Sequence, residues 1–133
     1  MASLLDTDIL SAIMRRNNSV MPKSRAYLQE HQRFHFSIIT RYEILRGLKA
    51  IDAHRRLETF EQLCLRSTVI HLSDAIISKA SDVYADLSKR GELIGDADIL
   101  IAASALVHGF GLVTNNERHF QRITDLQVEN WIE

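Results

Sequence analysis

The hydrophobic and polar residues of this chain follow two alternating patterns. Short apolar segments bounded by polar residues are typical of buried strands, and apolar residues spaced three or four positions apart predict helices. The expected strands lie at residues 3–7, 34–39, 68–72, 111–115 and 126–131. In residues 34–39 only the first part is expected to form a strand. The expected helices cover residues 8–16, 22–32, 40–51, 54–66, 74–89 and 97–108.

The expected strands and helices alternate along the chain. This order favours an α/β fold in which helices cover both faces of a mainly parallel sheet. A length of 133 residues fits one domain, residues 1–133. Ligands of such sheets bind at the carboxyl ends of the strands. The polar residues expected there are Asp6 and Thr7 after the first strand and Thr114 to Asn116 after the fourth.

Polar residues at the predicted helix starts are candidates for N-caps. Asp8 is the expected cap of the first helix, with Asp6 as the alternative, and Asp96 is the expected cap of the last long helix. The helices at 40–51 and 54–66 carry apolar stripes, so we expect them to pair as an αα-hairpin.

Composition places the chain among soluble globular proteins, with 46% hydrophobic and 25% charged residues. No apolar run approaches the about 20 residues of a membrane span, and the N-terminus lacks the pattern of a signal peptide. The single cysteine fits a reducing compartment. We therefore expect a cytoplasmic protein without membrane contact.

Charge is distributed unevenly although the net charge is only −1. Residues 1–66 carry 11 Lys and Arg against 7 Asp and Glu, whereas residues 67–133 carry 5 against 10. A basic half can bind a polyanion, and it can equally consist of solvated helix faces. Charge alone leaves both interpretations open.

Four acidic residues interrupt apolar stretches: Asp6, Glu43, Asp96 and Asp98. Each has an ordinary structural explanation, because an Asp can cap a helix and a helical Glu can pair with a nearby Arg. Taken together they point to a cation, since clustered carboxylates repel one another and raise one another's pKa. Oxygen ligands without a set of Cys or His residues suit Mg²⁺ or Mn²⁺ rather than Zn²⁺.

One enzyme family shares parts of these motifs. DTDIL, LVTN and GDADI resemble the motifs of haloacid-dehalogenase-type phosphatases. Here, however, the acidic motif GDADI precedes the threonine strand, which reverses the order of that family. A small-molecule phosphatase is therefore the weaker alternative.

Five segments together resemble the PIN domain and, more narrowly, the VapC-type toxins of bacterial toxin–antitoxin pairs. In order they are SLLDTDILS, SIITRYEILRG, IGDADILIAASAL, GFGLVTNNERHFQRI and LQVENW, and they span residues 3–131. The resemblance implies a three-layer α/β/α sandwich that acts as a Mg²⁺- or Mn²⁺-dependent endoribonuclease.

The resemblance also implies roles for individual residues. The acids that match the catalytic and metal-binding positions are Asp6, Glu43 and Asp98. The auxiliary residues of the site are Asp96, Thr114 and Asn116. His119 occupies the place where a further acid is expected, so the resemblance leaves a fourth carboxylate unassigned.

The partners that the resemblance implies are an RNA substrate, a cognate antitoxin and a second copy of the chain in a homodimer. The C-terminal segment of the antitoxin is expected to lie along a groove and to block the acids. The hairpin over residues 40–66 suits either protein contact, and its packing on its own sheet is the simpler explanation. Because the fourth position is incomplete, a non-catalytic module of the same fold that binds RNA or protein is the main alternative.

Overall fold

Five parallel strands form one sheet in the computed structural model, which describes residues 1–133. Their spatial order is β3-β2-β1-β4-β5, so β1 lies at the centre and the strand order reverses between β1 and β4. The strands are β1 (Ser3–Leu5), β2 (His35–Ser37), β3 (Thr68–Ile70), β4 (Gly111–Val113) and β5 (Val128–Glu129).

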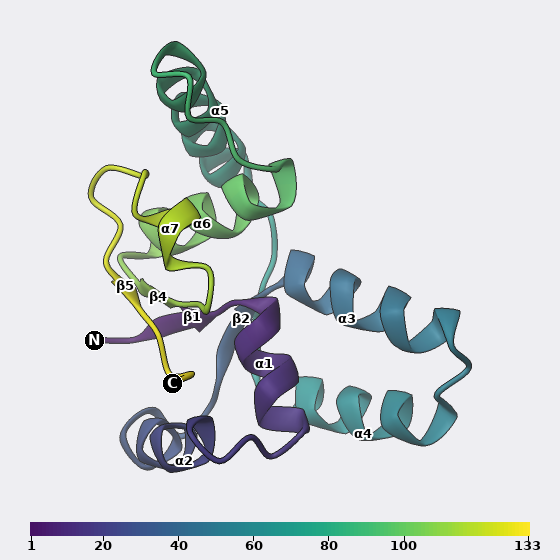
Figure 1. Ribbon diagram of the computed structural model, residues 1–133. Coiled ribbons are helices and arrows are strands. Elements are labelled where there is room, and N and C mark those ends of the chain that lie inside the picture. Colours follow the sequence, from purple (N-terminus) through teal and green to yellow (C-terminus); the bar gives the residue numbers. More distant parts are fainter.

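Helices cover both faces of this sheet (Figure 1). Those on one face are α1 (Thr7–Met14), α2 (Val20–His31), α3 (Ile38–Ala50) and α4 (His54–Leu65). Those on the other face are α5 (Asp74–Lys89), α6 (Asp96–His108) and the short α7 (Glu117–Phe120). This arrangement confirms the α/β fold with a parallel sheet between two helical layers. No helix combines the length and the apolar character that crossing a membrane requires.

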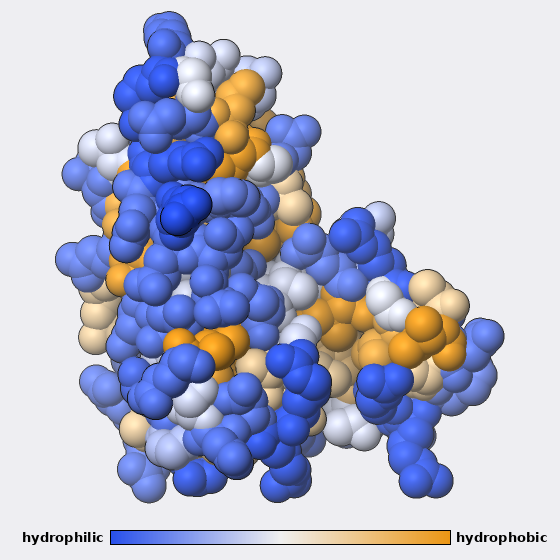
Figure 2. Space-filling model, viewed as in Figure 1, coloured by the Kyte–Doolittle hydropathy of each residue, from blue (hydrophilic) through white to orange (hydrophobic).

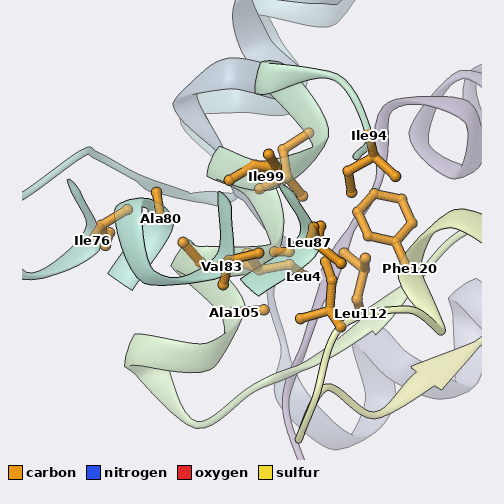
Figure 3. Close-up of a cluster of buried hydrophobic side chains, with 14 of the residues drawn as sticks. Leu4, Ile76, Ala80, Val83, Leu87, Ile94, Ile99, Ala105, Leu112 and Phe120 are labelled. Carbon is orange, nitrogen blue, oxygen red and sulfur yellow. The ribbon is translucent and has the colours of Figure 1, made fainter. Parts of the chain in front are cut away.

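Alternate side chains of the central strands supply the two hydrophobic cores, because successive residues of a strand point to opposite faces. Leu4 packs with α5 and α6, whereas Leu5 packs with α1 to α4. The same division holds in β4, where Leu112 joins the first core and Val113 the second. Figure 3 shows the first core, in which Leu4 and Leu112 lie beside side chains of α5 and α6.

Helix α6 is apolar on nearly all sides because it lies between the sheet and α5. Ile101 and the small residues that follow it are fully buried, and Ala102 and Ala103 leave room for the neighbouring elements to approach. Burial ends toward the C-terminus of the helix, where Val107 is 38% exposed. The buried length of α6 fixes the position of its N-terminus.

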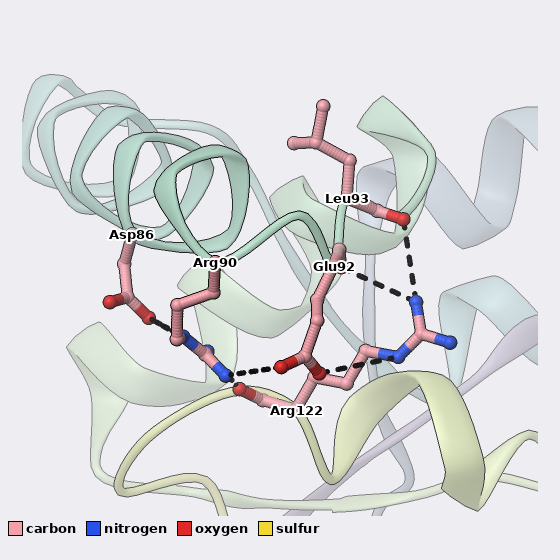
Figure 4. A network of polar contacts seen from close by, with 5 residues as sticks. All are labelled: Asp86, Arg90, Glu92, Leu93 and Arg122. Atoms are coloured by element: carbon pink, nitrogen blue, oxygen red, sulfur yellow. Dashed lines mark hydrogen bonds and ion pairs between the residues drawn. The ribbon is translucent and has the colours of Figure 1, made fainter.

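A polar network fixes the segment that leads into α6 (Figure 4). Arg90, which follows α5, donates to Asp86 Oδ2 at 2.8 Å and to Glu92 Oε1 at 3.2 Å. Arg122 donates to the main-chain carbonyl groups of Glu92 at 3.3 Å and Leu93 at 3.4 Å. The turn after α7 is thereby tied to the segment between α5 and α6.

The observed strands are shorter than the expected ones because polar residues at their ends begin helices. Asp6 ends β1 and caps α1, and Ser37 caps α3 through a bond from Ile39 N to its hydroxyl at 3.0 Å. Helix α3 therefore starts two residues before the expected position. The prediction that Asp8 caps α1 is wrong, because Asp6 is the cap and Asp8 lies inside the first turn.

Candidate functional site

Asp6 lies where the central strand β1 passes into α1. Its Oδ1 accepts a hydrogen bond from Thr7 N at 2.8 Å, and its Oδ2 accepts one from the Thr114 hydroxyl at 2.7 Å. Asp6 is only 6% exposed. Burial and, after it, the negative charge of Asp8 raise the pKa of Asp6 to about 7. Asp6 is thus a buried carboxyl group whose charged form the fold disfavours.

Glu43 comes from the middle of α3 and is held by two threonines. The Thr7 hydroxyl donates to Glu43 Oε1 at 2.6 Å, and Thr7 Oγ1 lies 3.1 Å from the hydroxyl of the buried Thr40. A hydroxyl has one proton, so Thr7 donates to Glu43 and accepts from Thr40. On its other side Glu43 Oε2 lies 3.8 Å from Arg46 Nη2. The surface ion pair expected of a helical Glu is present, but the shorter contact directs Glu43 toward α1.

Asp98 lies in the first turn of α6 and is half-buried. Burial and the charge of Glu43 raise its pKa, while His119, with Nδ1 at 3.8 Å from Asp98 Oδ2, opposes this shift. The charge of Asp98 also contributes to the raised pKa of Asp6. Asp98 therefore interacts electrostatically with both of the other predicted acids, although the three come from different elements.

Asp8 is an acid of this neighbourhood that the sequence pattern assigned to helix capping. Its Oδ2 accepts a hydrogen bond from Asn115 N at 3.1 Å, and its Oδ1 is buried without a partner. Burial raises the pKa of Asp8, and the charge of Asp98 adds to that rise. The acidic group at this edge of the sheet thus contains Asp8 in addition to the three predicted members.

The loop after β4 organises one side of this group. Thr114 is fully buried; its hydroxyl donates to Asp6 and accepts from Asn116 N at 2.9 Å. The Asn116 amide Nδ2 lies 2.8 Å from His119 Nδ1. Asn116 therefore orients His119, and His119 in turn faces Asp98.

Asp96 is not part of this arrangement. The predicted cap of α6 is wrong, because Gly95 is the N-cap and no side chain bonds there. Asp96 is exposed, and it lines a hollow beside Ile77 and Tyr84 of α5. The two acids of GDAD are thus separated by the turn of the helix, and only Asp98 interacts with the other acids.

The donor chemistry of the site fits Mg²⁺ or Mn²⁺. The polar side chains nearest Asp6 are carboxylates and hydroxyls, and an orphaned buried oxygen, Asp8 Oδ1, lies among them. No three carboxylate, imidazole or thiolate side chains converge closely enough to hold one ion by direct contact alone. Mg²⁺ does not require such convergence, because it keeps several waters and is commonly bound by one or two carboxylates together with substrate oxygens.

An open groove of about 360 Å³ runs from this site between α1, α3 and α4. Thr7 and Glu43 line it, and so do two exposed cations, Arg15 and Arg56. Figure 2 shows that apolar side chains gather on the projecting lobe formed by α3 and α4. The groove therefore offers apolar walls, positive charge and direct access to Glu43.

Comparison with known proteins identifies the family, since the PIN domain family matches residues 3–126. The chain belongs to the PIN domain family. Ribonuclease VapC2 of Haemophilus influenzae is 33% identical over 131 residues, 97% of each chain. The tRNA(fMet)-specific endonuclease VapC of Shigella flexneri is 29% identical over 96% of each chain. The structure of VapBC-1 from nontypeable H. influenzae shares 30% identity and a TM-score of 0.83, with 98% of both chains covered.

The family match confirms the resemblance seen in the sequence, and the sheet between two helical layers confirms the expected α/β/α architecture. Two features of the site in this PIN domain lay outside the motif pattern. One is the hydrogen bond from Thr7 to Glu43, which links residues 36 positions apart. The other is Asp8, for which the spacing of the acids in DTD was the available signal. The side chain of an N-cap lies near the backbone of the second and third helical residues, so proximity of Asp8 to Asp6 could have been inferred once Asp6 was taken as the cap.

Proposed function

We propose that this PIN domain is an endoribonuclease that uses Mg²⁺ or Mn²⁺ to hydrolyse phosphodiester bonds in RNA, with residues 1–133 acting as one domain. The observation that carries the proposal is that acids from three separate elements are held near the carboxyl ends of β1 and β4. Thr114 after β4 bonds Asp6, Thr7 beside Asp6 bonds Glu43 of α3, and Asp98 of α6 faces His119. Relatives of full length that are named ribonuclease or endonuclease support the same activity.

In the proposed reaction the oxygen of a water molecule bonds to phosphorus, the bond from phosphorus to O3′ breaks, and O3′ takes up a proton. The products are a 5′-phosphate and a 3′-hydroxyl. A bound divalent cation supplies a water of lowered pKa and neutralises charge on the phosphate. Asp6, Glu43 and Asp98 would hold this cation together with its water molecules, because no three of the side chains converge closely enough for direct contact alone.

Neighbouring polar groups would keep these carboxylates in place. Thr114 fixes one oxygen of Asp6, and Thr7 fixes one oxygen of Glu43. Asn116 orients His119 against Asp98. These contacts within the fold fix the directions of the carboxylates, and preorganised charge is the main way in which such sites lower a barrier.

We also propose that the chain is the toxin of a toxin–antitoxin pair, acts in the cytoplasm and has a cognate antitoxin as its partner. Structures of VapBC complexes that resemble the chain over nearly their full length support this partner. The groove between α1, α3 and α4 gives a segment of the antitoxin direct access to Glu43. The homodimer expected from the sequence stays a prediction, and exposed Tyr42 and Ile51 on the hairpin are its candidate contacts.

The test is cleavage of structured RNA by the purified full chain with MgCl₂. We expect cleavage that EDTA removes and that Asp98→Asn abolishes. The control is Asp74→Asn, which removes an exposed acid from the first turn of α5 and is expected to leave cleavage unchanged. Undiminished cleavage by both Asp6→Ala and Asp98→Asn would contradict the assignment of these residues.

The same purified chain also distinguishes the proposed nuclease from a non-catalytic module of the same fold. That alternative predicts RNA binding without cleavage in Mg²⁺ or Mn²⁺, and no heat of Mn²⁺ binding at millimolar metal in a calorimetric titration. Mapping of the RNA ends after induced expression of wild type and Asp98→Asn then identifies the RNA that is cut.

A further inference from the structure

Thr40 is a fully buried residue of α3 whose hydroxyl has a single hydrogen-bond partner. That partner is the Thr7 hydroxyl of α1, with 3.1 Å between the two oxygens. A buried hydroxyl costs free energy unless it is hydrogen-bonded, so this enclosed Thr calls for an explanation. The ordinary one, a bond from the hydroxyl to a carbonyl of its own helix, holds for buried Ser24 and Ser104 but not for Thr40.

The protons of this contact run in one direction. Thr7 Oγ1 lies 2.6 Å from Glu43 Oε1, and an ionised carboxylate can only accept, so the one hydroxyl proton of Thr7 is donated to Glu43. Thr40 then donates to Thr7, which gives a chain of two hydrogen bonds that ends at Glu43. In such a chain each bond polarises and strengthens the next. The Thr40 hydroxyl therefore acts on Glu43 without bonding to it.

The place of Thr40 in the fold suits this role. Helices α1 and α3 begin side by side after the neighbouring strands β1 and β2 (Figure 1). Thr40 and Glu43 are three residues apart on α3 and share one side of the helix, where the Thr7 hydroxyl meets both. The main-chain N–H of Thr7 donates to Asp6 at 2.8 Å. Thr7 thus joins two acids of the site, and Thr40 fixes Thr7.

We propose that Thr40 is a positioning residue of the nuclease site, which holds the Thr7 hydroxyl in the direction that bonds Glu43. Glu43 is thereby kept toward α1 instead of turning to Arg46, which lies 3.8 Å from its other oxygen. This inference rests on the proposed function, because the role exists only if Glu43 serves the reaction. It requires the hydroxyl of Thr40 and assigns no part to the methyl group.

The test is a double-mutant cycle on the purified full chain with structured RNA and MgCl₂. Thr40→Val removes the hydroxyl, and we expect kcat to fall about three- to tenfold with KM unchanged, the range of one neutral hydrogen bond. In the Thr7→Val background the same substitution is expected to cause no further loss, because the chain of bonds is already broken. An equal loss in both backgrounds would overturn the proposal, because Thr40 would then act independently of Thr7.

Two single variants control for loss of packing. Thr40→Ser retains the hydroxyl without the methyl group and is expected to keep most of the activity. Ser24→Ala removes a buried hydroxyl of α2 that bonds to the Met21 carbonyl, and it is expected to leave kcat unchanged. Thermal unfolding verifies that each variant is folded. A loss of activity in Thr40→Ser as large as that in Thr40→Val would overturn the role of the hydroxyl.

Mn²⁺ binding to the metal-free chain, measured by calorimetry, gives a readout that does not depend on cleavage. Because Glu43 is assigned to the cation, Thr40→Val is expected to lose Mn²⁺ affinity by a similar factor and Thr40→Ser to retain it. If wild type cleaves RNA and Thr40→Val matches it in kcat and in Mn²⁺ affinity, only the role of Thr40 is overturned. If wild type neither cleaves RNA nor binds Mn²⁺ at millimolar metal, the proposed function is overturned and the role of Thr40 falls with it.

Discussion

Two threonine hydroxyls hold two carboxylates of the candidate site, and each joins residues that are distant in sequence. Thr114 bonds Asp6 from the end of β4, and Thr7 bonds Glu43 on α3. A hydrogen bond to a charged group contributes about 1.5–3 kcal/mol. These bonds are therefore large enough to decide which way a carboxylate points.

Replacing Thr7 by Val keeps the shape of the side chain and removes the proton donated to Glu43. Glu43 is then free to turn toward Arg46, and we expect kcat for RNA cleavage to fall about tenfold while RNA binding stays unchanged, since a tenfold change corresponds to about 1.4 kcal/mol. Thr7→Ser retains the hydroxyl and is expected to keep most of the activity. Equal rates for Thr7→Val and wild type would show that this bond does not position Glu43 for the reaction.

The raised pKa of Asp6 predicts how the stability of the metal-free protein depends on pH. Its pKa is about 7 in the folded protein against 3.8 for an ordinary Asp, so the fold favours the neutral form. The resulting stabilisation is complete below about pH 4 and is lost as the pH rises through about 7, by on the order of 2–4 kcal/mol.

Asp6→Asn mimics the neutral form and isolates this contribution from those of other acids. We expect the free energy of unfolding of wild type to fall relative to Asp6→Asn between pH 4 and pH 8, measured by urea denaturation in the presence of EDTA. A difference between the two proteins that stays constant over this range would contradict the predicted shift.

The sequence identifies carboxylates better than it identifies what holds them. Asp6, Glu43 and Asp98 each interrupt an apolar pattern, which any reader of the sequence can detect. The partner of Glu43 could not be found in this way, because its bond to Thr7 depends on how α1 and α3 pack against each other on one face of the sheet. The N-cap of α1 is Asp6 rather than Asp8 because β1 ends at Leu5, two residues before the expected end of the strand.

At the scale of elements, α6 carries a catalytic candidate at its start and more buried residues than any other helix. Burial of Ile101 is complete, so Ile101→Ala removes apolar contacts and leaves a cavity. We expect it to lower the free energy of unfolding by about 2–5 kcal/mol in urea denaturation. Val107→Ala, at an exposed position of the same helix, is expected to change it by less than about 1 kcal/mol. A similar decrease in the free energy of unfolding for both variants would mean that the buried part of α6 does not anchor the fold.

The order and type of the long elements could be predicted because their apolar periods are clear. The short α7 could not, since four residues of ERHF carry no period that distinguishes a helical turn from a loop. The fifth strand is reduced to Val128–Glu129 because only these residues pair with β4. The boundaries of strands and helices depend on polar N-cap residues. Which residue becomes the cap is decided by local backbone geometry and not by the pattern of apolar residues.

At the scale of the whole molecule, the basic half of the sequence becomes the side of the fold formed by α1 to α4. Arg15 and Arg56 line the groove beside Glu43 and form no ion pair. Cations that are exposed and unpaired are available to phosphates. This favours the polyanion-binding interpretation of the uneven charge.

Substituting Arg15 and Arg56 together by Ala tests this interpretation. In the non-cleaving Asp98→Asn background we expect weaker binding of single-stranded RNA and a slope of log K against log salt that is smaller by about 1.4, because each lost phosphate contact removes about 0.7. Lys79→Ala with Lys89→Ala, a matched pair on α5, is expected to leave the slope unchanged. An unchanged slope in the arginine pair would place the RNA outside the groove.

The strand order has a consequence for the time at which this protein becomes active. Asp6 is synthesised 108 residues before its partner Thr114, and β1 lacks its neighbour β4 until then. At about 5–20 residues per second, roughly 5–20 s of translation separate the two residues. A nascent chain therefore carries the first acid of the site without the strand that completes it until residue 114 has been made. We expect the proposed activity to arise only after that point.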